Sequence, residues 1–337
     1  MCQYELWAGA YTGGRPGTGA WRLGFDGTAL KVAERWQGLT DSSYLQPAGG
    51  RVFAVEELPD SAALVELLPG GRLDRRPLPG SGLCHVTAWG GRLYASGYSG
   101  GCLAGLDLDT GKPCCYLEHS GQGPNPARQD RAHIHSAQPS PDGSRLLVAD
   151  LGLDRLFQYA AQPDGALTPF APQPWVCTPP GEGPRHFAFH PSGQALYLAA
   201  ELGLKLLVYR LQGSRLQGDR LEFCQAHALG DPHSQPESLA ADVQVSPDGR
   251  FVYASVRGAD AILCFRAEDP ASLRPAGSFP SGGRSPRSFS LSPDGQFLAA
   301  ANQSGVLAVF PLDRETGALL PLCAAIDLPE VCCVKFA

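Results

Sequence analysis

The chain has 337 residues, enough for about two domains of ordinary size or for one large domain built from repeated units. Hydrophobic residues make up 43% of it, which is ample for a packed core, while 41 glycines and 30 prolines predict many turns. A net charge of −6 argues against a protein that binds nucleic acid through a basic surface, although a local cluster of arginines for a small anion stays compatible with it.

The first seven residues carry no recognisable targeting signal. They lack a basic segment followed by an apolar run of about 7–15 residues, and no apolar stretch approaches the ~18–20 residues of a membrane-spanning helix. We therefore expect a cytoplasmic protein that does not contact membranes. The 11 cysteines include adjacent pairs at 114–115 and 332–333 but no C-x-x-C spacing, so buried free thiols are expected rather than disulfides or a zinc ribbon.

Six segments of the chain share one pattern, in which a turn with a central glycine precedes a basic or small residue and a β-rich apolar run. In chain order the central glycines are Gly49, Gly90, Gly143, Gly193, Gly249 and Gly295. Proline and aspartate favour the early turn positions, glycine supplies the positive φ, and the flanking runs are too short for helices. Each segment therefore predicts a β-hairpin.

The spacing of these glycines predicts how many units the fold contains. The intervals are 41, 53, 50, 56 and 46 residues, so the chain accommodates about seven units although only six turns occur. Residues 6–12 resemble a strand that follows a turn, and residues 331–336 resemble a strand that precedes one. We therefore predict an all-β fold with one domain over residues 1–337. It is a seven-bladed β-propeller with four-stranded blades, closed by the N- and C-terminal strands in one blade.

In such a ring, residues equidistant from a hairpin turn return to the same rim of the central channel. The positions eight before and eight after each glycine are Asp41, Gly82, His135, Arg185, Ala241 and Arg287, and then Glu57, Tyr98, Leu151, Glu201, Arg257 and Gln303, with Tyr11 added by alignment. One histidine, one glutamate (Glu201) and three arginines thus share a register across four consecutive units. Each could be a solvated strand-end residue. As a set, they predict a pocket for a small anion.

This set suits attack by water on an acyl carbon of an anionic substrate. Paired arginines bind a carboxylate or phosphate and stabilise an oxyanion, and Glu201 or His135 can act as general base. The predicted catalytic residues are His135, Arg185, Glu201 and Arg257. The predicted substrate-binding residues are Arg287, His133, Tyr98, Glu57 and Gln303.

Two other motifs offer competing chemistry. The run from Gly97 to Gly101 fits the G-x-S-x-G pattern of a nucleophile elbow, but a strand rather than the required helix is expected after it. His133 and His135 have the spacing of two zinc ligands on one face of a strand, and His85 or Glu201 could supply a third. Two histidines alone are a weak signal, and we expect neither a metal nor another cofactor.

Several stretches resemble the seven-bladed propeller lactonases, which include the propeller-type 6-phosphogluconolactonases and the fungal 3-carboxy-cis,cis-muconate lactonizing enzyme. They are residues 123–130 (GPNPARQD), 133–136 (HIHS), 148–155 (VADLGLDR), 183–191 (GPRHFAFHP), 256–258 (VRG), 285–287 (SPR) and 301–303 (ANQ). The resemblance runs from about residue 9 to the C-terminus and is thinner before residue 80.

This resemblance implies a metal-independent lactone hydrolase whose active-site set falls on His135, Arg185, Glu201 and Arg257. The family usually has asparagine before that glutamate and before the last arginine, where this chain has Ala200 and Val256. The leading expectation is hydrolysis of 6-phospho-D-glucono-1,5-lactone by a monomer or weak homo-oligomer.

Two alternatives stay open. One is a carboxymuconate cyclase or a lactonase for another sugar lactone. The other is a non-catalytic propeller that binds a protein partner, although Tyr11 and Tyr98 are the only aromatic residues in this register.

Overall fold

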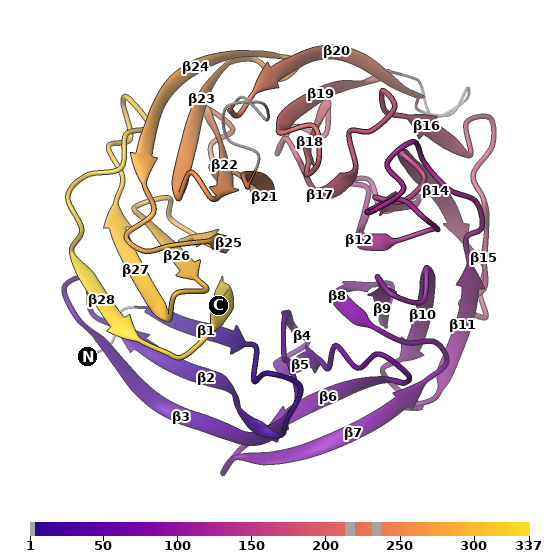
Figure 1. Cartoon of the computed structure of the whole chain (residues 1–337), viewed down its shortest axis with the longest axis horizontal. Coiled ribbons are helices and arrows are strands. Elements are labelled where there is room, and N and C mark those ends of the chain that lie inside the picture. The colour runs from indigo at the N-terminus through magenta and orange to yellow at the C-terminus, as the bar shows by residue number, and fades with distance from the viewer. Residues whose placement is uncertain (1–3, 213–219, 231–236) are drawn as a thin grey trace.

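The structure is a ring of seven antiparallel sheets around a central axis (Figure 1). It is a computed structural model that describes residues 4–212, 220–230 and 237–337, so residues 1–3 of the segment searched for a targeting signal lie outside it. Within the described residues, the long regular elements are strands, and no helix has the length and apolar character to cross a bilayer. The prediction of an all-β, seven-bladed propeller is confirmed.

The closing blade combines both ends of the chain. Its innermost strand is β29 (Val331–Phe336), followed outward by β1 (Tyr4–Ala10), β2 (Gly17–Phe25) and β3 (Leu30–Leu39). β29 and β1 pair antiparallel, with Val334 opposite Ala8. The predicted closure of the ring by the two terminal strands is therefore confirmed.

The other blades follow in chain order, each beginning with its innermost strand. The second and third blades are β4 (Leu45–Ala48), β5 (Arg51–Val55), β6 (Ala62–Leu68) and β7 (Arg72–Leu78), then β8 (Leu83–Trp89), β9 (Arg92–Gly97), β10 (Cys102–Asp107) and β11 (Pro113–Glu118). The fifth and sixth are β17 (Pro184–Phe189), β18 (Ala195–Ala200), β19 (Lys205–Gln212) and β20 (Arg220–Ala228), then β21 (Leu239–Val245), β22 (Phe251–Arg257), β23 (Ala261–Asp269) and β24 (Ser272–Pro280). The seventh is β25 (Pro286–Leu291), β26 (Phe297–Asn302), β27 (Val306–Pro311) and β28 (Ala324–Asp327).

The fourth blade departs from the four-stranded pattern because its outer edge is divided. It contains β12 (Ile134–Pro139), β13 (Leu146–Asp150), β14 (Arg155–Ala161), β15 (Leu167–Pro169) and β16 (Trp175–Cys177), and both β15 and β16 pair with β14. Pro169, Pro172 and Pro174 lie in and between the two short strands. Proline has no N–H to donate to a sheet, so one continuous outer strand is not possible here.

The six predicted hairpins connect the innermost strand to the second strand in blades two to seven. Their central glycines all adopt positive φ, between 58° and 76°. The second strands are deeply covered; β13 and β18 are buried at every position because blades pack against both of their faces. This packing fixes the height at which each second strand ends, and therefore the height of the residue that follows it.

The cysteines are less buried than expected. All ten described cysteines are free, but only Cys84, Cys102, Cys264, Cys332 and Cys333 are buried, while Cys177 is exposed. The expectation was partly wrong because it counted cysteine as a core residue, whereas Cys177 lies on the short strand β16 at the outer edge of its blade.

Two glycine substitutions test the hairpin geometry. Alanine at either Gly143 or Gly249 must adopt a positive φ, which costs about 1–2 kcal/mol. At Gly249 a Cβ would also lie 2.5 Å from Nε2 of His190, whose bond to the Gly249 carbonyl would be lost, whereas nothing lies within 4 Å at Gly143. We expect Gly249→Ala to lower the free energy of unfolding in urea by about 1 kcal/mol more than Gly143→Ala. Equal losses would contradict this.

Candidate active site

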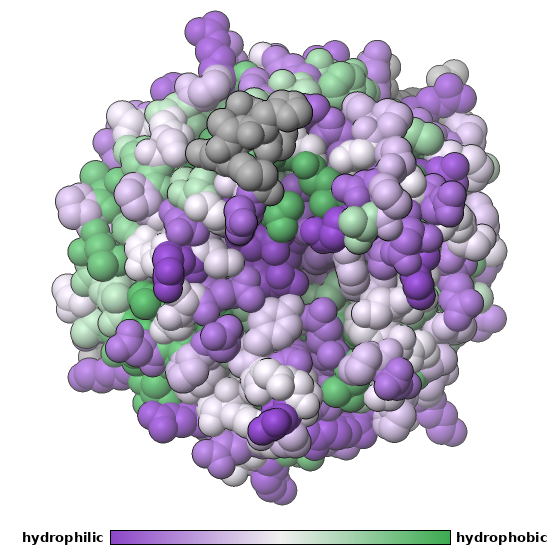
Figure 2. Space-filling view, in the orientation of Figure 1, coloured by the Kyte–Doolittle hydropathy of each residue, from purple (hydrophilic) through white to green (hydrophobic). Residues whose placement is uncertain are grey.

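A pocket of about 260 Å³ lies on the ring axis, at the rim where the second strands end. It is lined by Glu57, Cys84, Tyr98, Arg128, His135, Glu201, Leu239, Arg257 and Arg287. Figure 2 shows hydrophilic residues gathered where the centre of the ring is hollowed. Side chains from the second to the seventh blade therefore converge on one polar pocket, although they are up to 230 residues apart in the chain.

Glu201 is the point on which three arginines converge. It follows β18 and is only 2% exposed. Arg128 Nη2 donates to Glu201 Oε1 at 2.6 Å, while Arg185 Nε and Arg257 Nη2 lie 2.9 and 3.0 Å from Oε2. Burial raises the pKa of the Glu201 carboxyl, but Arg257, Arg185, His135 and Arg128 outweigh it and hold that pKa well below the usual 4.5. Glu201 is therefore a persistent carboxylate.

His135 lies beside this cluster as a neutral imidazole. It lies in the buried part of β12, is 4% exposed, and places Nε2 3.9 Å from Glu201 Oε2. Burial and the nearby Arg185 and His186 lower the pKa of His135 well below its ordinary 6.5. At neutral pH it can therefore accept a proton from water, which the tightly paired Glu201 cannot readily do.

Arg287 differs from the other arginines because its guanidinium is not paired with a carboxylate. It belongs to β25 and lies over the ring of Tyr11, 5.2 Å from the ring centroid. The Tyr11 hydroxyl donates to Glu57 Oε2 at 2.9 Å. Across the part of the chain that the structure describes, no ion pair within 4.0 Å and no guanidinium hydrogen bond engages Arg287. Its donors are available to an anionic ligand.

The structure brings six of the nine sequence-predicted residues to the pocket wall, namely Glu57, Tyr98, His135, Glu201, Arg257 and Arg287. Arg185 lies behind Glu201 and donates from Nη1 to the Ala241 carbonyl at 2.6 Å. His133 stacks on Tyr98, with ring centroids 4.3 Å apart. Gln303 accepts a bond from the Ser285 hydroxyl outside the pocket. These last three residues do not line the pocket.

The competing motifs find no support in the geometry. The run from Gly97 to Gly101 leads directly into β10, without the helix that a nucleophile elbow requires. His133 Nε2 lies 3.1 Å from Asp130 Oδ1, and His135 faces the pocket instead. Among the residues of known placement, no three histidine, cysteine, aspartate or glutamate side chains are arranged to hold a metal ion.

Arg128 is the charged pocket residue that the sequence reasoning missed, along with Cys84 and Leu239. It lies in the loop between β11 and β12, outside the register defined by the hairpin turns. The loop is anchored by its neighbour Gln129, which is fully buried and donates from Nε2 to the Leu151 carbonyl at 2.8 Å. The stretch GPNPARQD contained the signal, since an arginine beside turn-forming proline and asparagine has a fixed backbone from which to reach the pocket.

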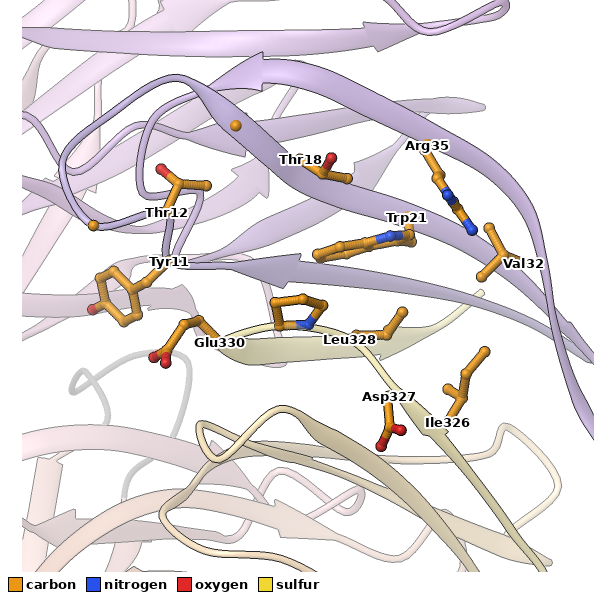
Figure 3. Close-up of a pocket in the computed structure, with 13 residues that line it drawn as sticks. Tyr11, Thr12, Thr18, Trp21, Val32, Arg35, Ile326, Asp327, Leu328 and Glu330 are labelled. Atoms are coloured by element: carbon orange, nitrogen blue, oxygen red, sulfur yellow. The ribbon is translucent and has the colours of Figure 1, made fainter.

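A larger groove of about 780 Å³ lies beside the closing blade (Figure 3). Trp21, Val32, Ile326 and Leu328 supply apolar walls, and Tyr11 lies at the end nearer the ring axis. The groove does not bring a base together with several cations. We therefore place the candidate chemistry in the smaller axial pocket.

Comparison with known proteins agrees with this fold. The profile of a family described as lactonase, seven-bladed beta-propeller, matches residues 5–336. The chain belongs to this lactonase family. A 6-phosphogluconolactonase of Formosa agariphila is 30% identical over 94% of this chain and 95% of its own length. One from Bacillus subtilis is 34% identical over 66% of this chain, which spans 62% of that relative's length. The expected class, a 6-phosphogluconolactonase-like lactone hydrolase, agrees with these relatives.

Solved structures show the same likeness to this lactonase-family protein. A Bacteroides fragilis protein superimposes with a TM-score of 0.90 at 27% identity, covering 100% of this chain and 98% of its own. A Pseudomonas aeruginosa protein named periplasmic gluconolactonase has a TM-score of 0.86 at 29% identity, with 99% of each chain covered. Since one relative is named as periplasmic, the cytoplasmic location of this chain stays a prediction.

Glu201→Gln tests the charge cluster through stability. Removing the carboxylate leaves three arginines close together, so we expect the unfolding free energy at pH 7 to fall by roughly 3–5 kcal/mol. The pKa of Glu201 is lower in the folded protein than its unfolded value near 4.5. Its contribution to the free energy of unfolding is therefore complete above pH 4.5 and is lost as the pH falls through the folded pKa. The difference between wild type and variant in urea unfolding should shrink below pH 4.5. A constant difference down to pH 2.5 would contradict this.

Proposed function

We propose that this protein hydrolyses 6-phospho-D-glucono-1,5-lactone to 6-phosphogluconate with activated water and without a metal ion. The observation that carries the proposal is the contrast within the pocket between Arg287, which has no carboxylate partner, and Arg128 and Arg257, which are paired with Glu201. One free guanidinium beside a neutral imidazole suits a substrate that has both an anionic group and an electrophilic carbon. The names of the curated relatives support the same substrate.

In the proposed reaction, His135 is the general base. Its neutral imidazole takes a proton from a water molecule, and the water oxygen forms a bond to the lactone carbonyl carbon. The carbonyl oxygen becomes a tetrahedral oxyanion beside Arg257, which lines the pocket. When the bond from that carbon to the ring oxygen breaks, the imidazolium returns its proton to the leaving oxygen. The products are the open-chain hydroxyl and the carboxylic acid.

Glu201 has a different role here from the base considered in the sequence analysis. Its low pKa makes it a weak proton acceptor, but its carboxylate lies 3.9 Å from His135 Nε2 and stabilises the transient imidazolium. It also fixes Arg257 and Arg128 beside the reacting carbon through their ion pairs. We therefore assign Glu201 to electrostatic support and orientation.

An unphosphorylated sugar lactone is the second candidate substrate, because a structural relative that covers 99% of the chain is named gluconolactonase. In that case Arg287 would lack a phosphate partner. A carboxymuconate substrate would place a carboxylate there instead. The three substrates therefore differ in the group that meets Arg287, which makes this residue the place to test specificity.

Arg287→Met keeps an unbranched stem similar to the aliphatic part of the arginine side chain and removes its charge. The purified wild-type protein should hydrolyse 6-phosphogluconolactone in the presence of EDTA, after correction for the spontaneous reaction. The variant should raise KM for this substrate about 10- to 150-fold, since a charge-assisted bond contributes about 1.5–3 kcal/mol. Its KM for gluconolactone should change less than threefold.

Other outcomes would redirect the assignment. Equal changes in KM for the two lactones would show that Arg287 does not bind the phosphate. Wild-type activity on gluconolactone alone would overturn the phosphorylated substrate, and loss of activity only with EDTA would overturn the metal-free mechanism.

His135→Asn tests the proposed base. We expect kcat for the lactone to fall about 10²–10³-fold, because general base catalysis typically contributes that much. The matched control is His133→Asn, two residues away and outside the pocket wall, which should lose less than tenfold. Wild-type kcat/KM should be level from neutral pH through pH 6.5 and decline only well below it, because the lowered pKa of His135 delays protonation of the imidazole. If both variants retain activity within tenfold of wild type, His135 is not the base.

A further inference from the structure

A second polar chamber lies on the ring axis, nearer the hairpin turns than the candidate active site. Its volume is about 210 Å³, and it is formed mainly by the innermost strands β4, β8, β12, β21 and β29. Only Ala188 and Val243 among its lining residues lack a polar side chain. None of its lining residues belongs to the wall of the candidate active site. The chamber is therefore separate from the candidate active site.

Lys335 places an ammonium group in this chamber without a carboxylate partner. Its Nζ donates to the Tyr44 hydroxyl at 2.7 Å and lies 4.4 Å from the centroid of that ring. The one acid that lines the chamber, Asp242, instead faces His186 Nδ1 at 2.9 Å and accepts from the Val243 amide. No carboxylate lies within 4.0 Å of Lys335 in the described part of the chain. An ammonium has three N–H donors, so two remain available to a ligand.

His85 adds an unpaired nitrogen to the same chamber. It is 2% exposed and stacks against Tyr44 with ring centroids 4.2 Å apart, and its Nδ1 has no hydrogen-bond partner. Burial of a polar atom without a partner costs about 1–3 kcal/mol. The unpaired nitrogen and the ammonium thus both lack partners that a ligand could supply.

The chamber also offers hydrogen-bond acceptors. The side-chain nitrogens of Gln46 and Gln138 donate to the backbone carbonyls of Pro47 and Phe187. Each amide oxygen, together with the second N–H of each amide, is left for a ligand. A ligand with a negative charge for Lys335 and an O–H for these oxygens therefore fits the chamber.

We propose that this chamber binds a small protonated oxyanion of the hydrogen phosphate type, with Lys335 and His85 as donors and Gln46 and Gln138 as acceptors. The volume equals that of about seven water molecules, which suits a five-atom oxyanion with a few waters. Lys335 disfavours a metal cation in the same place. Binding here is independent of the proposed hydrolysis and would hold for a protein with any activity.

The position of His186 connects this chamber to the candidate active site. Its ring centroid lies 5.4 Å from that of His85 and 5.3 Å from that of His135, and its Nε2 has no partner. An anion beside His85 is therefore two imidazole rings away from the proposed general base. Occupancy of the chamber should be visible at His186 as well as at His85.

The test is titration of histidine-labelled protein with inorganic phosphate at constant ionic strength, observed through the imidazole nitrogen resonances. Saturable shifts are expected at His85 and His186. Lys335→Met should weaken this binding at least tenfold, whereas Arg287→Met, which removes a cation from the other pocket, should leave it within threefold of wild type. Shifts abolished by Arg287→Met alone, or unchanged in Lys335→Met, would assign the phosphate to the other pocket and overturn the proposal. Absence of saturable shifts at 50 mM phosphate would overturn it too.

A second measurement does not depend on the folding of a variant. Wild-type crystals soaked at neutral pH in arsenate, a tetrahedral oxyanion that keeps an O–H as phosphate does and has a strong anomalous signal, should show arsenic between Lys335 and His85. Anomalous density only beside Arg287, or none in the chamber, would show that the chamber holds water alone. Either result can be read whether or not the protein hydrolyses a lactone, so failure of the proposed function is distinguishable from failure of this site.

Discussion

The carboxylate of Glu201 lies among three guanidinium groups in a nearly fully buried part of the ring axis. Without it, Arg185 and Arg257 would repel each other where solvent screens charge poorly. The cations come from the loop before β12, from β17 and from the end of β22, so one carboxylate ties together three successive blades at the rim. Desolvation offsets much of the attraction in such a cluster, and its main contribution is to fix geometry.

Closure of the ring places the other half of the candidate site. Arg287 belongs to the seventh blade, Tyr11 follows β1 in the closing blade, and Glu57 follows β5 in the second blade. The contacts from Arg287 to Tyr11 and from Tyr11 to Glu57 therefore cross the seam where the two chain ends meet. If β29 did not pair with β1, Tyr11 would lose its fixed position, and the unpaired guanidinium would lose the aromatic surface that holds it.

The hairpin register predicted much of this site because a propeller repeats one geometry. Glycine with positive φ marks each inner turn, and counting along two antiparallel strands returns to one height, so His135, Glu201 and Arg287 were found from spacing alone. Arg128 was not, since its loop has no partner strand against which to count. Gln303 satisfied the register but turns to Ser285, because the direction of a side chain after a strand end depends on local contacts.

The same ring geometry explains why polar groups extend along the whole axis. Each of the seven innermost strands points one row of side chains toward the ring axis. The space along the axis is too narrow for aliphatic side chains to pack from all sides. Polar residues there must therefore pair with one another, with water or with a ligand. At the rim, Arg128, Arg185 and Arg257 pair with Glu201. Nearer the turns, Lys335 donates a hydrogen bond to the hydroxyl of Tyr44. His135 and His186 separate the two regions, and since both are buried and neutral, the charges on either side are divided by imidazole rings rather than by an apolar layer. The two regions are therefore joined through His186, whose ring centroid lies 5.4 Å from that of His85 and 5.3 Å from that of His135.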